Sequence, residues 1–411
     1  MSRTDYVRQS LIDEPPPPRA RFTSNKRRRR RIRHRRIRRT ILIVTLGALI
    51  WLSFSIGGAL LNPALGSSAG SRLAEWARMH GGSGVVNWAE NQWYAHHPPK
   101  VGGAVPPGSI VKPPVTGKVV STVPHLAMPN AIRPFASPAL PGEGAWRPVG
   151  RPVDGMPAVY ETTLRPDAIH TSYVVGVAWM DTKLLHATLY SGSWIPGGGP
   201  YPNTAPVKSP AARTLVTAFN AGFLMSGAQG GYYTDHKVVI PLRTGAASFV
   251  VYKNGTSDIV AWPSAGAIPS NVSSVRQNLD LLVQNGHEVA GLQANDTSKW
   301  GLTLGDAVYV WRSGLGVTAN GALVYVGGPG LNITDLASLL VRAGAVRAME
   351  LDINTDWVNF SSYKPSTSTG PATAANGALL LPGMTGSTSR YFESWWARDF
   401  ITMSADPTKK G

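Results

Sequence analysis

The stretch from Trp311 to Trp357 constrains the fold most, because it predicts a hairpin, a helix and a further strand in direct succession. Asn320 and Gly321 lie between the apolar runs 315–318 and 323–326, and an Asn-Gly pair in this setting is a strong signal for a two-residue hairpin. These runs are therefore expected to form adjacent antiparallel strands.

A helix is predicted directly after this hairpin. Asn332 can cap it, the apolar positions of residues 333–343 share one face, and Gly344 is the expected stop. The glycine-rich loop 327–330 in front of the helix either binds an anion at the helix N-terminus or simply connects two elements.

The next run, 345–354, alternates between apolar and polar residues, so Glu350, Asp352 and Asn354 share one strand face. A strand joined to a hairpin by one helix is expected in the same sheet, where Arg312 approaches the two carboxylates. Either this polar face lies in water, or the arginine beside paired carboxylates suits phosphate binding next to acid/base chemistry.

Further along the chain, strand signals dominate. Strands are predicted at 174–180, 184–190 and 215–219 and as a hairpin at 248–252 and 259–262, with helices near 275–282 and 393–400. The fold class expected is α+β, a mixed β-sheet domain with a few helices.

The N-terminal region predicts a membrane span. The chain carries a net charge of +17, of which +12 lies in residues 1–40, and an uncharged apolar run follows from Ile41 to Leu61. This run has about the length needed to cross a bilayer, and positive residues stay on the cytoplasmic side. We expect a single-pass protein of the cell membrane with a cytoplasmic N-terminus, a main domain on the extracytoplasmic side, and no nucleic-acid partner. A cleaved signal peptide, an Arg-Arg export signal and nucleic-acid binding are alternatives that fit these residues less well.

The chain is expected to divide into five parts. These are a basic cytoplasmic tail at 1–40, a transmembrane helix at 41–63, a juxtamembrane helical segment at 64–97, a Pro-rich linker at 98–157 and the main domain at 158–404. The juxtamembrane segment either lies in the membrane interface or packs on the main domain. The linker is expected to be a stiff spacer, part of which can lie against the domain.

The chain has no cysteine, which excludes disulfides and Cys-ligated metals. His236 and His287 are isolated, without the spacing of a metal site, so we expect neither a metal nor another cofactor. The preference for Arg over Lys and the richness in Ala and Gly indicate a bacterial origin.

Three blocks resemble the phosphodiester glycosidase domain, the catalytic domain type of the uncovering enzyme, which removes N-acetylglucosamine from sugar phosphodiesters. The family block N-G-G-F-F is similar to residues 220–224, the arginine block with a following Gly-Val to residues 312–317, and the block L-D-G-G-G-S to residues 351–356. The resemblance extends roughly from Val159 to Met403. It implies an α+β domain that acts on a sugar phosphodiester.

Departures from the family pattern are concentrated around Asp352. Glu350 stands where the family usually has Asn, and the glycines after the aspartate are replaced by Ile353, Asn354 and Thr355. Losing these glycines removes the backbone freedom for close approach to a ligand. Either the pocket is rebuilt for another substrate or the glycosidase chemistry is lost.

The resemblance implies roles for individual side chains. Arg312 would bind the substrate phosphate, or instead form a structural ion pair with Glu350 or Asp352. Asp352 would be the acid/base or nucleophilic carboxylate. Glu350, which departs from the family pattern, is a candidate for the second carboxylate of a glycosidase pair.

Five residues are candidates for substrate binding, each with a structural alternative such as turn formation, helix capping or simple surface exposure. They are Asn220, Gly222, Arg243, Arg276 and Asn354.

The function expected is that of a membrane-anchored extracytoplasmic hydrolase that cleaves a sugar from a sugar-phosphate diester in an envelope glycan or glycolipid. The alternative is an inactive glycan-binding or scaffolding protein of the cell envelope, which keeps the fold without the chemistry.

Overall fold

The computed structural model describes residues 22–66, 68–82, 84–86, 99–114, 122–263, 268–296, 299–301, 308–384 and 387–405. The chain divides into two compact units, Met1–Leu61 and Asn62–Gly411. The first contains one helix, α1 (Phe22–Leu61). Its part Arg30–Leu61 is the one helix within the described ranges that is long and apolar enough to cross a membrane. A helix of this kind near the N-terminus is either a membrane span or a signal sequence.

The second unit contains the remaining elements, most of them strands. The helical ones are η1 (Pro63–Leu65), α2 (Ala69–Met79), α4 (Ala211–Thr214), α5 (Ile333–Arg342), η3 (Ala374–Asn376) and η4 (Arg390–Phe392). The strands up to residue 261 are β1 (Arg147–Val149), β2 (Val159–Leu164), β3 (Val175–Met180), β4 (Leu185–Tyr190), β5 (Leu215–Asn220), β6 (Tyr232–Thr234), β7 (Lys237–Ile240), β8 (Ala247–Tyr252) and β9 (Ser257–Ala261). The later strands are β10 (Val272–Gln277), β11 (Leu281–Gln284), β12 (His287–Glu288), β13 (Val310–Thr318), β14 (Leu323–Leu331), β15 (Ala345–Glu350), β16 (Phe360–Tyr363), β17 (Gly377–Leu379) and β18 (Phe400–Ala405).

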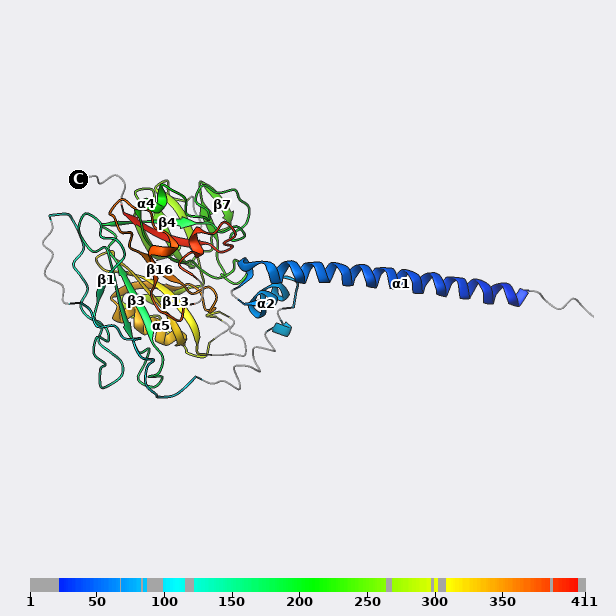
Figure 1. Ribbon diagram of the computed structural model, residues 1–411, viewed down its shortest axis with the longest axis horizontal. Helices are drawn as coiled ribbons and strands as arrows, with labels where there is room; N and C mark the ends of the chain where they lie inside the picture. The colour runs from blue at the N-terminus through cyan, green and yellow to red at the C-terminus, as the bar shows by residue number, and fades with distance from the viewer. Residues whose placement is uncertain are drawn as a thin grey trace, which may run out of the picture. The chain divides into compact units, whose positions relative to one another are not determined.

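These strands form three sheets, with the orders β1-β2-β3-β14-β13-β15-β11-β12, β7-β6-β10-β8-β9 and β17-β16-β5-β18-β4. Figure 1 labels β3 and β13 of the first sheet, β7 of the second, and β4 and β16 of the third. The ladders described between named strands are antiparallel, and the parallel pairing that is described is the isolated bridge between Ser191 and Thr204. The predicted α+β class is confirmed, with strands as the main component.

The eight-stranded sheet is covered on both faces. Helix α5 packs on one face, where Leu336 and Leu340 are fully buried in a cluster with residues of β3, β14 and β15. On the other face, Tyr325 of β14 contacts Phe219 and Phe360 of a five-stranded sheet, with ring centroids 5.4 and 5.1 Å apart. The strands that carry the candidate residues are therefore held from both sides by apolar contacts.

The predicted hairpin, helix and strand are confirmed in their order and connections. β13 pairs with both β14 and β15, and α5 makes the crossover between the two outer strands. Asn332 caps α5 in a capping box with Asp335, at 2.8 Å from the Asn332 side-chain oxygen to the Asp335 backbone nitrogen. Two boundaries differ. β14 runs to Leu331, so the predicted loop 327–330 is part of this strand. β15 ends at Glu350, and residues 351–354 form a loop.

Two predicted helices are wrong. Residues 275–282 lie in β10 and β11, and Phe400 begins β18 after a short turn in which the Trp396 backbone N–H donates to Glu393. Both segments are short apolar runs, for which helical and strand periods cannot be told apart, and pairing with neighbouring strands decides the outcome.

The segments before the main domain also pack on it. Within the expected juxtamembrane helical segment 64–97, α2 is helical, whereas residues 87–97 lie outside the described residues. In the expected linker, Leu126, Ile132 and Trp146 are buried, and the Leu126 backbone N–H donates to Asp181 at 2.7 Å. The linker is therefore not a free spacer at these residues. They lie against the domain, as the sequence analysis allowed for part of the linker.

Candidate functional site

The candidate site lies where the chain leaves β15. Asp352 follows this strand by two residues, and its backbone is fastened to Ser313 of β13. The Ser313 backbone N–H donates to the Asp352 carbonyl at 2.8 Å, and the Asp352 N–H donates to the Ser313 hydroxyl oxygen at 3.1 Å. Sequence reasoning missed Ser313, although it lies inside the arginine block. Its contacts fix the position of Asp352 relative to the sheet.

The loop after Asp352 is shaped by side-chain oxygens instead of glycines. Asp352 Oδ1 accepts from the Asn354 backbone N–H at 2.9 Å, and Asn354 Oδ1 accepts from the Asp356 N–H at 2.8 Å. Asx turns of this kind bend a chain without positive φ angles. The predicted binding residue Asn354 thus has a clear role in the turn.

The Asp352 carboxyl has an unusual proton affinity. Burial raises its pKa to about 6, an effect opposed by the charge of Arg398 and by backbone N–H groups of the loop, and reinforced by Glu75. Because 4% of the residue is exposed, the carboxyl is almost removed from water. A carboxyl with a pKa near neutrality can accept or donate a proton under ordinary conditions.

Arg312 and Glu350 approach each other across β13 and β15, as predicted. Arg312 Nη1 donates to Glu350 Oε1 at 2.6 Å, and both side chains are buried. The guanidinium also donates to the carbonyls of Leu331 and Trp300 at 3.1 and 3.2 Å. The geometry therefore matches the structural alternative, an internal ion pair, and leaves the arginine little capacity for a substrate.

Glu350 keeps one unused oxygen. Its Oε2 is buried with no hydrogen-bond partner in the part of the chain that the structure describes. Burial raises the pKa of Glu350 to about 7, against the lowering effect of Arg312. Only its other oxygen is committed to the ion pair.

Asn220 lies at the end of β5, beside the same residues. Its amide nitrogen donates to the Ser313 hydroxyl oxygen at 3.0 Å, and its Oδ1 accepts from Tyr325 at 2.8 Å and from the Asn359 backbone N–H at 3.1 Å. The structure thus brings Asn220 together with the Asp352 loop through Ser313, in a network that already uses both ends of the amide.

The other predicted binding residues, Gly222, Arg276 and Arg243, have different surroundings. Gly222 lies against Arg276 and Asn278, and a Cβ there would come within 2.8 Å of the Asn278 oxygen. Arg276 is buried and donates to Asp399 at 2.6 Å. Arg243 is part of the surface and pairs with Asp280 at 2.7 Å.

Two charged residues that sequence reasoning did not place in the site lie near Asp352. Arg398 precedes β18, and its Nη2 lies 3.7 Å from Glu75 Oε1 of α2. Both residues are buried, with 7% and 6% exposed. The Arg398 guanidinium lies over the Trp357 ring, 4.3 Å from its centroid. No sequence signal pointed to either residue. Arg398 lay in a predicted helix, and Glu75 lay in the juxtamembrane segment.

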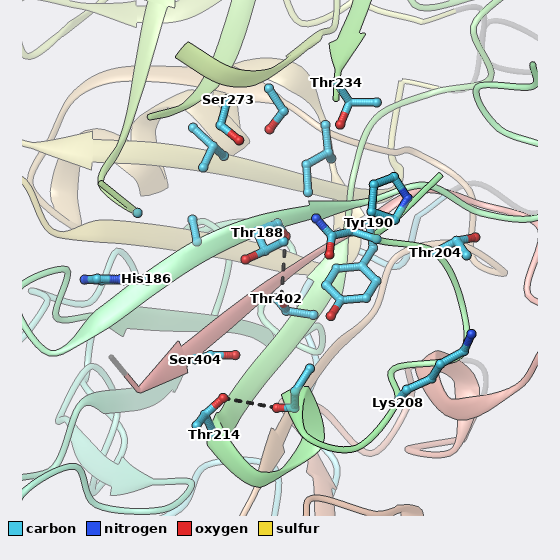
Figure 2. A pocket seen from close by; sticks show the side chains of 18 of the residues that line it. His186, Thr188, Tyr190, Thr204, Lys208, Thr214, Thr234, Ser273, Thr402 and Ser404 are labelled. Atoms are coloured by element: carbon cyan, nitrogen blue, oxygen red, sulfur yellow. Dashed lines mark hydrogen bonds between the residues drawn. The ribbon is translucent and has the colours of Figure 1, made fainter. Parts of the chain in front are cut away.

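A separate cavity of about 770 Å³ lies between two of the sheets. Its lining carries many hydroxyl groups, among them Thr188, Ser273, Thr402 and Ser404, together with Lys208 (Figure 2). The predicted site residues do not line it. Its size is that of small-molecule sites in proteins, so it is a second place where a ligand can fit.

No cluster of three or more His, Cys, Asp or Glu side chains that could hold a metal ion occurs within the described ranges.

Fold and site together define an α+β domain with a buried carboxyl two residues past the end of β15. Residues 213–352 match the family model described as phosphodiester glycosidase, so the resemblance predicted from the sequence is confirmed over this stretch. No curated protein matches the chain.

Two solved structures are similar to the chain at low identity. One is the catalytic domain of zebrafish N-acetylglucosamine-1-phosphodiester alpha-N-acetylglucosaminidase, auto-inhibited by its pro-peptide, with 13% identity and a TM-score of 0.39, covering 63% of this chain and 87% of that one. The other is a hypothetical protein from Synechocystis, with 12% identity and a TM-score of 0.33, covering 62% of this chain and 63% of that one.

Proposed function

We propose that the domain hydrolyses a sugar phosphodiester, cleaving the bond between the sugar carbon and the phosphate oxygen. The observation that carries this proposal is the family match, which ends at Asp352, a buried carboxyl with a pKa raised to about 6. Envelope glycans and glycolipids are the substrate class that a membrane-anchored domain of this kind would meet.

In this mechanism Asp352 acts as general base. It accepts a proton from a water molecule, the water oxygen bonds to the sugar carbon, and the phosphate monoester leaves with the electrons of the broken bond. Such a leaving group is weakly basic, so it needs its charge stabilised more than it needs a proton. Glu350, held by Arg312, lies two residues before Asp352 at the end of β15.

The test is hydrolysis of a panel of sugar-1-phosphate diesters by the detergent-solubilised full chain, with Asp352→Asn as the control. We expect kcat/KM to rise with pH through about 6, because the base must be ionised, and to fall by roughly 10²- to 10⁴-fold in Asp352→Asn. Full activity in this variant would contradict the assigned role. A folded protein without turnover across the panel would contradict the proposed reaction.

The same proposal places the domain outside the cytoplasm, anchored by α1, with arginines of the N-terminal region at the inner lipid surface. The absence of cysteine makes this testable by labelling. With a membrane-impermeant maleimide on intact cells, Ser366→Cys on the exposed surface should react and Ser10→Cys should not. Labelling of Ser10→Cys but not of Ser366→Cys would show that the orientation is the opposite one.

A glycan-binding protein without catalysis is the second candidate. This candidate is favoured by the hydroxyl-lined cavity, whose lining residues do not include Asp352. It is also favoured by the internal hydrogen bonds that occupy Asn220 and Arg312. Two results would support the binding protein. Binding of neutral and acidic oligosaccharides should be unaffected by Asp352→Asn, and it should be lost in Ser273→Trp, which fills the cavity with a large side chain.

A further inference from the structure

Arg398 differs from Arg276 and Arg312, two other buried arginines of the domain, in how its nitrogens are used. Arg276 and Arg312 each donate hydrogen bonds from all three guanidinium nitrogens. Arg398 Nη1 is buried and has no hydrogen-bond partner among the residues that the structure describes. An unmade hydrogen bond of a buried charged group is costly. This guanidinium therefore has donor capacity to offer to an anion.

The acidic partner that Arg398 does have is held loosely. The 3.7 Å between Arg398 Nη2 and Glu75 Oε1 exceeds hydrogen-bond length, so the pair is electrostatic only. Glu75 is shared with Arg78, whose Nη1 lies 3.5 Å from the other carboxylate oxygen. A phosphate at hydrogen-bond distance would interact more strongly with Arg398 than this carboxylate does.

The guanidinium is nevertheless fixed in place beside the site. It stacks on Trp357, which belongs to the loop that begins at Asp352. The next residue, Asp399, is held by Arg276 at 2.6 Å, and Phe400 pairs with Asn220. Among the charges that act on Asp352, Arg398 has the largest lowering effect on its pKa. The arginine is thus held beside the loop that carries Asp352, close enough for its charge to act on the carboxyl.

Helix α2 reaches the same place by a second contact. The turn before the helix touches the Asp352 loop, because a Cβ on Gly66 would lie 3.2 Å from Asp356 Oδ2. Two contacts therefore seat this end of α2 over the loop, with the Glu75 carboxylate directed at Arg398.

We propose that Arg398 is the phosphate-binding residue of this domain and that Glu75 of α2 occupies it until an anionic substrate displaces the carboxylate. The proposal deepens the proposed function and rests on it for the identity of the substrate. It moves the phosphate site from Arg312, whose donors are used within the sheet, to a residue outside the stretch that matches the family. Arg398 would stabilise the charge that develops on the departing phosphate.

The first experiment measures binding of inorganic phosphate to the full chain in detergent, followed by tryptophan fluorescence, since Trp357 lies under the guanidinium. Arg398→Gln should weaken binding at least about tenfold, as expected for loss of a hydrogen bond to a charged group. Arg347→Gln is the matched control, because this arginine also pairs with a carboxylate, Asp258 at 2.6 Å, but on the surface. It should bind phosphate as the wild type does.

Glu75→Gln provides a second variant that retains Arg398. Removing the competing charge should tighten phosphate binding several-fold. Wild-type affinity in Arg398→Gln, unchanged affinity in Glu75→Gln, or no phosphate binding by any variant would overturn the proposal.

Turnover of the sugar-1-phosphate diesters separates this inference from the proposed reaction. Arg398→Gln should raise KM for diesters, whereas the surface control Arg347→Gln should leave KM and kcat unchanged. Turnover of diesters that does not depend on Arg398 would refute the phosphate site and leave the reaction standing. Arg398-dependent phosphate binding without turnover would refute the reaction and leave the phosphate site standing.

Discussion

Two arginine–glutamate pairs lie beside the Asp352 loop, and they differ in geometry and surroundings. Arg312 and Glu350 meet at 2.6 Å across neighbouring strands, with backbone carbonyls around the guanidinium. Arg398 and Glu75 meet at 3.7 Å between a loop and α2, with one guanidinium nitrogen that has no hydrogen-bond partner among the described residues. The first pair is built into the sheet, whereas the second joins segments from opposite ends of the domain.

The difference shows how one ion-pair chemistry can serve two purposes. A short pair with its remaining donors satisfied is strongly destabilised by the loss of one partner, because a buried charge is then left alone. A long pair with unused donors loses little when a partner leaves, so a ligand can replace it. In these two pairs the donor count, more than burial, separates the structural arginine from the one proposed to bind substrate.

The largest effect is expected from breaking the short pair. Arg312→Met should lower the free energy of unfolding by about 3 to 5 kcal/mol, because Glu350 would remain buried without its partner. Urea unfolding at neutral pH measures this. The double variant Arg312→Met, Glu350→Met should recover most of the loss, since no charge is then stranded. A single variant as stable as the wild type would show that this pair is dispensable.

A smaller effect is expected from pH. The folded-state pKa of Glu350 is about 7, above its ordinary value of 4.5, so the folded protein holds this proton more tightly than the unfolded chain. Its contribution to stability is therefore complete below about pH 4.5 and is lost as pH rises to about 7. Over this window it should reduce the unfolding free energy by on the order of 3 kcal/mol.

The control for this pH effect is the same double variant, which lacks the titrating carboxyl. Its unfolding free energy should decline less between pH 4.5 and 7 than that of the wild type. Parallel declines in the two proteins would assign the pH dependence to other buried carboxyls, such as Glu161, whose pKa burial also raises to about 7.

The smallest effect is expected from breaking the long pair. Arg398→Gln should lower the unfolding free energy by about 1 kcal/mol, chiefly through loss of the contact with the Trp357 ring. The same urea experiment compares it with Arg312→Met. A loss as large as that of Arg312→Met would remove the distinction between a structural and an available arginine.

The sequence predicted those parts of the site whose signals are local. The Asn320-Gly321 turn, the Asn332 cap and the alternation before Glu350 each act over a few residues, and together they placed Arg312 beside Glu350. The contact between Glu75 and Arg398 joins distant segments, and no local pattern encodes it. Near residue 275, pairing with other strands overrode a pattern that allowed either period.

The loop of Asp352, Asn354 and Asp356 has a consequence for how this domain can change over evolutionary time. Its bend is specified by the acceptor oxygens of alternate residues, so Asp352 shapes the backbone in addition to any reaction it serves. A descendant that lost turnover would still be under pressure to keep an oxygen-bearing side chain at this position. Retention of the aspartate in a relative would then be a mark of the turn, and activity would have to be established by its own measurement.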